Sequence, residues 1–367
     1  MTLRPFATTL ALLLMLITNG QVRANEASSS AYEAVIRNTI QSAIIPAYKN
    51  LLNKAVEQAS ALDAFCQSPD DKKLFHIRTA FRELVMAWSA AEIYRLGPAT
   101  NENRQEKLLF WPDRRGRGLK QVRKLIADQN QDALDPVKLQ KKSVAVQGLL
   151  ALEYVLYGDR SDDITRPQEN IFRCSYAASI LQVIQENTDN ILKGWQDKNG
   201  YAALMLKAGP DNPIYKTDKE VIRDLLQKAD EMILTIESRK LAPMLRKNRE
   251  QANHKRAPFW RSNLTLFSIR ANLQSVLDFQ EKAALKTLLP EEDRGEADAL
   301  IFEITQSLKT LQLLDKQPSL EATLKSANGY DKLAYLKNPL KGAHVILSDY
   351  YPTALSITMG FNSLDGD

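Results

Sequence analysis

The sequence has 367 residues, of which 44% are hydrophobic and 25% are charged, as is typical of folded proteins. Its net charge of +5 is too small to indicate a nucleic-acid partner. Leu, Ala, Gln, Lys and Glu dominate the composition, and no segment shows the clear alternation of a β-strand. We therefore predict an all-α protein made of two helical-bundle domains packed together.

The chain is expected to begin with a signal peptide at residues 1–24. Arg4 precedes an apolar run at residues 7–17, and Val22 and Ala24 occupy the two positions that signal peptidase reads. Removal of residues 1–24 takes away two arginines and no acidic residue, which leaves a net charge of +3. Because the run is too short to span a membrane, we expect a periplasmic protein. An uncleaved N-terminal anchor is the alternative.

The N-terminal domain is predicted to comprise residues 25–207. Apolar residues recur at intervals of three and four over residues 32–60 and 71–96, which predicts two helices. Pro46 is expected to kink or divide the first of them. Residues 101–118 form an irregular segment that contains the sequence FWPDRRGRG. Further helices are expected at about residues 119–128, 136–157 and 168–198.

A cluster of Gly, Pro and Asn at residues 208–213 predicts the boundary between the domains. The C-terminal domain then covers residues 208–367. Its Pro258-Phe259-Trp260 resembles Phe110-Trp111-Pro112 of the first domain, which is weak support for a duplication. The helices of this domain are expected at about residues 217–238, 262–287, 295–314, 319–336 and 339–355.

Cys66 and Cys174 are the only cysteines. In an oxidising compartment an isolated pair is most simply a disulfide. Such a bond would close a loop of about 108 residues, which stabilises a fold by roughly 4–5 kcal/mol in the chain-entropy model. Two buried thiols are the alternative. Neither cysteine has a second Cys or a His at the spacing of metal ligands.

One carboxylate stands out in the helix predicted at residues 136–157. Residues 147–159, QGLLALEYVLYGD, are apolar in every direction around a helix axis, which is typical of a buried helix. Glu153 lies in the middle of this segment, and a carboxylate is rarely buried without a partner. Arg95 and Arg114 are the candidate partners. Glu153 therefore forms either a structural ion pair or part of a ligand or metal site.

The usual catalytic signatures are absent, namely HExxH, GxSxG and the GxxxxGK[ST] phosphate loop. His76, His254 and His344 have no second His within four residues, so we interpret each as an ordinary surface or interface residue. The basic run at residues 114–124 forms either a solvated helix face or an anion site.

Several segments together resemble the imelysin family. GLLALEYVLYGD matches the family signature GxHxxE at Gly148 and Glu153, whereas Leu150 stands at the position of the His. The segments AWSAAEIYRLGP, FWPDRRGRG, RAPFWRS and GFNSLDGD resemble a subgroup of the same family. The resemblance implies two four-helix-bundle-like domains with a functional site at their interface. It also implies export to the periplasm or outer membrane and an association with iron uptake. The family carries a peptidase name, but peptidase activity is poorly supported as a general property of the family.

The departure at Leu150 decides how the site is interpreted. Leucine cannot ligate a metal, so the His–Glu pair of the signature is not available. We expect a binding protein for a metal, a chelate or another small ligand in a cleft between the domains, with no catalytic residue assigned. Iron or another divalent metal is a candidate cofactor, and Glu153 is its one candidate ligand. The predicted ligand-binding residues are Glu153, Arg95, Trp88, Trp111, Asp113, Arg114, Gly148, Tyr157 and Arg261.

Two alternatives stay open at this stage. A metallopeptidase or other hydrolase would need ligands from separate segments, such as Glu153 with His76 or His344. A helical scaffold would bind another envelope protein through an exposed apolar patch. For the binding protein we expect a monomer that is peripheral to the membrane at most. Its expected partners are the small ligand or metal and other envelope proteins of iron uptake, but not nucleic acid.

Overall fold

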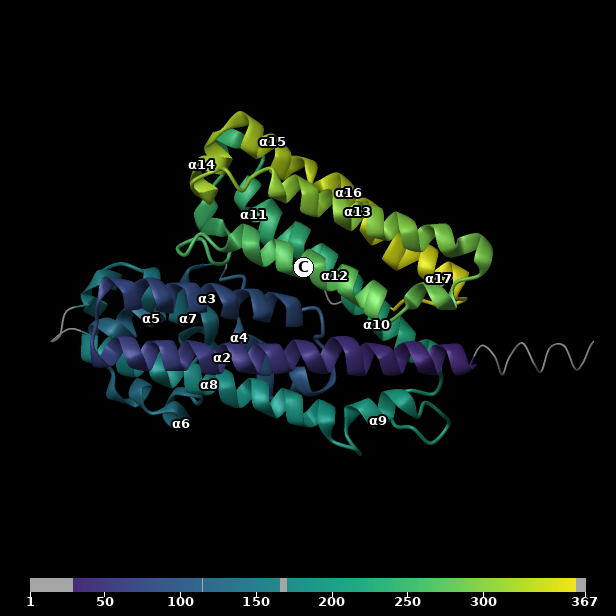
Figure 1. The fold of residues 1–367 in the computed structure, drawn as a ribbon, viewed down its shortest axis with the longest axis horizontal. Coiled ribbons are helices and arrows are strands. Elements are labelled where there is room, and N and C mark those ends of the chain that lie inside the picture. The colour runs from purple at the N-terminus through teal and green to yellow at the C-terminus, as the bar shows by residue number, and fades with distance from the viewer. Residues whose placement is uncertain (1–28, 114, 166–169, 361–367) are drawn as a thin grey trace, which may run out of the picture.

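The computed structural model describes residues 29–113, 115–165 and 170–360. The structure is 77% helical, and its described residues contain no β-strand. The all-α prediction is therefore confirmed. Figure 1 shows two groups of helices, one drawn in purple to teal and the other in green to yellow.

The first group is built on two long helices that a three-residue turn connects. These are α2 (Ile45–Gln67) and α3 (Asp71–Ala91), and Asp70 caps α3 by accepting a hydrogen bond from Lys73 N at 2.8 Å. α8 (Asn170–Gln196) packs against α2, and α7 (Gly148–Tyr157) packs against both α3 and α8, which closes a four-helix arrangement. The shorter helices of this group are α4 (Arg104–Leu108), α5 (Arg117–Ala127), α6 (Pro136–Leu139) and α9 (Tyr201–Leu206).

The second group repeats this arrangement. α10 (Asp218–Leu234) packs against α12 (Thr265–Lys282), and α12 packs against α13 (Arg294–Gln312). α16 (Lys337–Val345) contacts both α13 and α10 and closes the ring. The predicted boundary near residue 208 stays a prediction. The shorter helices are α11 (Ala242–Leu245), α14 (Leu320–Lys325), α15 (Ala327–Tyr335) and α17 (Tyr351–Ala354).

Some predicted helices are interrupted in the structure. The helix predicted at residues 136–157 is divided into α6, a 3-10 turn at Val144–Val146, and α7. The break has a backbone cause, because Gln147 is extended and Gly148 has a φ of 75°. The helix predicted at residues 319–336 is likewise divided at Ser326, whose side chain caps α15 by accepting a hydrogen bond from Gly329 N.

Within residues 29–360, leaving out the undescribed positions, three helices contain a π-helical segment, and a proline follows each of these segments. The segments are Thr39–Ile44, Thr235–Leu241 and Ile346–Tyr350, and the prolines are Pro46, Pro243 and Pro352. A proline cannot donate to the carbonyl four residues earlier, and its ring clashes with that carbonyl. In all three cases the residue before the proline donates to the carbonyl five residues earlier instead. The chain thus passes each proline as a widened helix, and Pro46 does not end the first helix.

The two groups of helices meet along α3 and α12, and a network of buried polar groups crosses this contact. Lys240 and Glu92 are each only 1% exposed, and Lys240 Nζ donates to Glu92 Oε2 at 2.9 Å. Asn272 Nδ2 donates to Glu92 Oε2 at 2.9 Å and to Ser89 O at 2.7 Å. Ser268 Oγ accepts from Lys240 Nζ at 3.2 Å and lies 2.9 Å from Ser89 Oγ. A charge buried in this way is tolerated because its hydrogen-bonding capacity is met.

Cys66 in α2 and Cys174 in α8 are joined by a disulfide, with their Cα atoms 6.0 Å apart. The bond ties together two helices of the first group. Within the described part of the chain, no helix combines the length and the apolar character that crossing a membrane requires.

The first prediction concerns the buried lysine. Replacing Lys240 with Met leaves Glu92 with a buried charge and one fewer donor, so we expect the free energy of unfolding to fall by about 3–5 kcal/mol. Lys193→Met, which removes the exposed i,i+4 pair of Lys193 with Asp189, should cost less than about 1 kcal/mol. Urea unfolding of the two variants measures the difference, and equal losses would contradict the role given to the network.

The second prediction concerns acid. Burial acts to raise the pKa of Glu92, but the charges of Lys240 and Arg95 and the hydrogen bonds from Lys240 and Asn272 outweigh it and lower the pKa to about 2. A carboxylate whose pKa is lowered by folding stabilises the fold above its unfolded pKa of about 4.3, and this contribution is lost as the pH falls toward 2. Unfolding free energies measured across this window should fall less steeply for Glu92→Gln than for the unchanged protein. The exposed Glu57→Gln variant should follow the unchanged protein.

Candidate functional site

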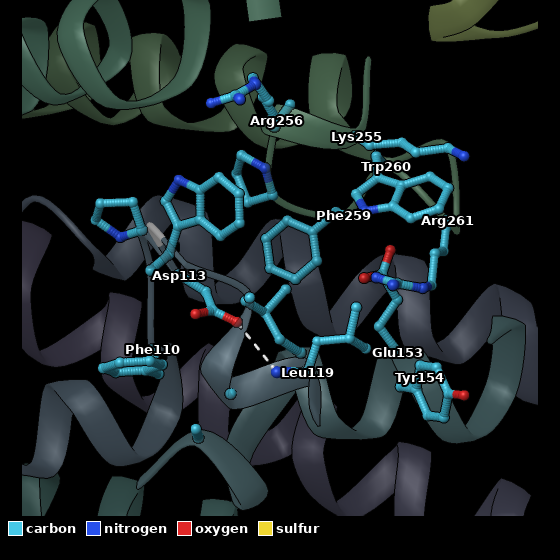
Figure 2. A pocket seen from close by; sticks show the side chains of 18 of the residues that line it. Phe110, Asp113, Leu119, Glu153, Tyr154, Lys255, Arg256, Phe259, Trp260 and Arg261 are labelled. Atoms are coloured by element: carbon cyan, nitrogen blue, oxygen red, sulfur yellow. Dashed lines mark hydrogen bonds between the residues drawn. The ribbon is translucent and has the colours of Figure 1, made fainter. Parts of the chain in front are cut away.

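A cleft with a volume of about 630 Å³ lies between the two groups of helices. Figure 2 shows Phe110, Asp113 and Leu119 on one side of it, and Lys255, Arg256 and Trp260 on the other. One wall is thus the FWPD sequence with α5 and α7, and the other is the RAPFWRS sequence. The described residues that line the cleft are Phe110–Asp113, Gly116, Gly118, Leu119, Val122, Arg123, Ala145, Leu150, Glu153, Tyr154, Asp159, Ser238, Arg239, Pro243 and Lys255–Arg261.

Trp111 connects the two walls. Its indole Nε1 donates to the carbonyl of Arg239 at 3.0 Å. That carbonyl lies four residues before Pro243, which has no N–H to donate to it. The π-helical segment therefore offers an acceptor to the opposite wall, and Trp111 uses it. The prediction that Trp111 lies at the cleft agrees with this position, and the Trp111–Pro112 peptide bond is cis.

The opposite wall is a turn with unusual backbone geometry. Phe259 has a φ of 57° and Asn263 a φ of 59°, values that cost free energy in residues other than glycine. The Phe259 ring is fully buried and contacts the ring of Phe81 at 6.5 Å between centroids. Thr265 Oγ1 donates to Pro258 O at 2.6 Å. The turn is held firmly by these contacts, so that Trp260 and Arg261 project toward the cleft (Figure 2).

Glu153 lies at the base of the cleft and is 1% exposed. Its Oε1 accepts two hydrogen bonds from Ser262, one from the backbone N at 2.9 Å and one from Oγ at 2.8 Å. Burial raises the pKa of Glu153, and the Ser262 donors and the charge of Arg261 only partly oppose this. The buried carboxylate of the first group of helices is therefore held by the turn of the second.

The predicted ion pair between Glu153 and Arg95 is wrong. Arg95 pairs with Glu92, three residues before it, and joins the network between α3 and α12. The other candidate, Arg114, lies outside the described residues. The partner that sequence reasoning missed is Ser262, which is 109 residues away from Glu153.

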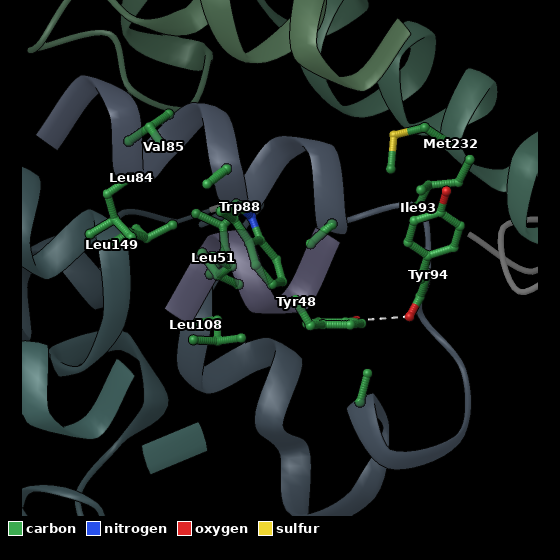
Figure 3. Close-up of a cluster of buried hydrophobic side chains, with 14 of the residues drawn as sticks. Tyr48, Leu51, Leu84, Val85, Trp88, Ile93, Tyr94, Leu108, Leu149 and Met232 are labelled. Atoms are coloured by element: carbon green, nitrogen blue, oxygen red, sulfur yellow. Dashed lines mark hydrogen bonds between the residues drawn. The ribbon is translucent and has the colours of Figure 1, made fainter. Parts of the chain in front are cut away.

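Three other predicted site residues do not line the cleft. Trp88 is 1% exposed and lies in the apolar core near Tyr48 and Leu51 (Figure 3). Tyr157 packs its ring under Arg78 at 5.0 Å and donates its hydroxyl to Arg78 O at 3.2 Å. Gly148 is the first residue of α7, where a Cβ would lie 2.2 Å from Lys107 O. All three residues contribute to the packing of the helices around the site and do not contact the cleft.

Asp113 and Arg261 do line the cleft, as does Leu150. Asp113 Oδ2 accepts a hydrogen bond from Leu119 N at 3.1 Å, which satisfies a free N–H in the first turn of α5. The Arg261 guanidinium lies over the ring of Trp260 at 4.2 Å and over that of Tyr154 at 5.4 Å. Trp260 and Tyr154 were not singled out from the sequence as site residues. Two features of the sequence could have indicated them. Trp260 lies in the segment that resembles Phe110-Trp111-Pro112, and Tyr154 directly follows Glu153.

Metal ligation was the other role considered for Glu153. Among the residues that the structure describes, no group of three His, Cys, Asp or Glu side chains could hold a metal ion. His344 Nδ1 lies 2.6 Å from Asp230 Oδ1, between α16 and α10. His76 is exposed on α3, and neither histidine is among the lining residues. The described residues therefore do not bring together the ligand sets that the hydrolase alternative named.

Comparison with known proteins places the chain in a family. The sequence matches the family model described as Imelysin over residues 44–347, and the chain therefore belongs to the imelysin family. An imelysin-like protein from Psychrobacter arcticum has a similar structure, with a TM-score of 0.75 and 20% identity over 91% of this chain and 98% of that one. A protein from Parabacteroides distasonis, provisionally described as an iron-regulated protein A precursor, gives 0.71 and 15% over 89% and 95%. At these identities the similarity shows the fold. No curated protein matches the sequence.

The third prediction tests the structural role of Gly148. Alanine at this position would combine a φ of 75° with a Cβ only 2.2 Å from a backbone oxygen, so Gly148→Ala should lower the free energy of unfolding by more than about 3 kcal/mol. Gly116 has a φ of 62° but open space around it, so Gly116→Ala should cost only about 1 kcal/mol. Thermal unfolding compares the two variants. A Gly148 variant as stable as the Gly116 variant would contradict this structural role of Gly148.

Proposed function

We propose that this protein is an exported binding protein of bacterial iron acquisition, and that it takes an iron chelate into the cleft between its two groups of helices. The observation that carries the proposal is the cleft itself. Its volume of about 630 Å³ lies within the range of small-molecule sites. Sequences from both halves of the chain build its walls, and a buried carboxylate is fixed at its base.

The state of the carboxylates favours a chelate over a bare metal ion. Glu153 accepts hydrogen bonds from Ser262, and Asp113 accepts one from Leu119 N. Asp159 pairs with Arg123. Each acidic side chain among the described lining residues is thus already engaged by a donor of the protein, whereas a bare cation would need several of them as ligands.

The link to iron and to export rests on relatives and on the N-terminal sequence. One protein of similar fold is described as an iron-regulated protein A precursor, and this chain begins with the features of a signal peptide. The family signature carries a His where this chain has Leu150, and Leu150 lines the cleft. An apolar side chain at this point suits ligand binding better than metal-assisted hydrolysis.

The fourth prediction tests binding in the cleft. The mature protein, which should begin at Asn25, is recovered from the periplasmic fraction and dialysed against ferric citrate and against ferric dihydroxybenzoate. We expect retention of iron and chelator together for at least one of them. Leu150→Trp should weaken retention roughly tenfold or more, equivalent to about 1.4 kcal/mol, because the larger ring fills the cleft.

The matched control is Leu313→Trp, which introduces the same ring at a side chain that is 64% exposed in the second group of helices. It should leave retention unchanged. Failure of the unchanged protein to retain either chelate, or equal retention by the two variants, would overturn the proposal. Retention of iron without chelator would show that the protein binds the bare metal.

A further inference from the structure

The charges around the cleft are unbalanced. Of its described lining residues, five are Lys or Arg and three are Asp or Glu. The pair of Arg123 with Asp159 accounts for one charge of each sign. Lys255 and Arg256 are exposed at the rim, and neither forms an ion pair with any described residue. The wall made by the RAPFWRS sequence therefore presents two cationic side chains that no ion pair within the described part of the chain engages.

The acidic residues do not compensate for this charge. Asp113 and Glu153 are both engaged by neutral donors, as described above. Glu153 is also buried, and burial raises its pKa. The charge of Arg261 acts to lower the pKa of Glu153 against the effect of burial, and its guanidinium lies over two aromatic rings.

The same wall is aromatic. Lys255 Nζ lies 5.5 Å from the ring centre of Trp260, and the Arg261 guanidinium lies 4.2 Å from it. Phe110 and Trp111 face this wall from the other side of the cleft. Cations held against aromatic faces form flat surfaces on which a conjugated ring can stack, while their N–H groups remain able to bind oxyanions.

We propose that the ligand of the cleft is a flat, conjugated organic anion with at least two acidic oxygen groups, which stacks against Trp260 and pairs with Lys255, Arg256 and Arg261. This inference rests on the proposed function only in placing the ligand in the cleft, and it needs no iron. It names the part of a chelate that the protein recognises, namely the ring and its charged oxygens. The cleft volume admits a small molecule of this kind.

The fifth prediction uses four metal-free probes, of which three share the naphthalene ring system. Naphthalene dicarboxylate, naphthoate and the neutral methyl naphthoate carry two, one and no charges, and cyclohexane dicarboxylate carries the charges without the aromatic ring. Calorimetric titration of the full chain should give affinities that fall in the order of decreasing charge. Cyclohexane dicarboxylate should bind more weakly than its aromatic counterpart, and the affinity for the dicarboxylates should fall as salt is added.

Variants separate the two elements of recognition. Arg256→Gln and Lys255→Gln remove exposed charges and should each weaken naphthalene dicarboxylate roughly tenfold while leaving methyl naphthoate unchanged. Trp260→Leu should weaken the aromatic probes and spare cyclohexane dicarboxylate. Arg249→Gln, which removes an exposed arginine that does not line the cleft, is the matched control and should bind every probe normally.

The outcomes distinguish this inference from the proposed function. Binding of the aromatic dicarboxylate without retention of either ferric chelate would support the anion site and overturn the role in iron acquisition. Retention of ferric chelates that is unaffected by Arg256→Gln, Lys255→Gln and Trp260→Leu would overturn the anion site alone. Equal affinity for methyl naphthoate and naphthalene dicarboxylate, or no binding of any probe, would also overturn it.

Discussion

The structure depends on one buried ionic contact, the pair of Glu92 and Lys240 at the junction of α3 and α12. Lys240 cannot be left without Glu92, because an unpaired charge in an apolar interface is far more costly than the pair. Without Lys240, Glu92 would keep only the partly exposed Arg95 as a charged partner. Asn272, Ser89 and Ser268 saturate the remaining donors and acceptors. Apolar surfaces tolerate sliding, whereas a saturated polar network fits in one register only. The network therefore fixes how the two groups of helices lie relative to each other, and with that the width of the cleft.

Two sets of hydrogen bonds connect the walls of the cleft itself. The indole of Trp111 donates to the carbonyl of Arg239, and the carboxylate of Glu153 accepts from Ser262. Each joins a residue of one wall to backbone of the other. The cleft is thus bounded on both sides by groups whose positions follow from the packing of α3 on α12. Glu153 has a structural task at the base of this site, and the contacts to a ligand fall to the cationic and aromatic side chains above it.

Much of the fold could be predicted from sequence because helical periodicity is a local signal. The features that were not predicted depend on contacts that a local pattern does not record. The break before Gly148 depends on the close approach of the Lys107 carbonyl, which periodicity does not encode. Glu92 lies three residues before Arg95, at a spacing that allows an ion pair within a helix. The prediction instead paired Arg95 with the distant Glu153, because Glu153 has only apolar neighbours in its own helix. Ser262 could not be found from sequence, since a serine 109 residues away carries no charge that marks it as a partner.

The π-helical segment at Thr235–Leu241 has a geometric consequence for the whole molecule. A π-helical segment inserts about one extra residue into a helix. The side chains after it are therefore rotated about the helix axis by about 100° relative to a regular α-helix. α10, before this segment, packs against α12 and α16 of its own group and contacts α9 of the other, and Lys240, near the end of the segment, pairs with Glu92 of the other group. The helix therefore directs Lys240 toward the other group of helices, although it packs on α12 and α16 of its own group. The missing N–H of Pro243 thus accompanies the change of helical phase in the segment that carries Lys240 to the contact between the two groups of helices.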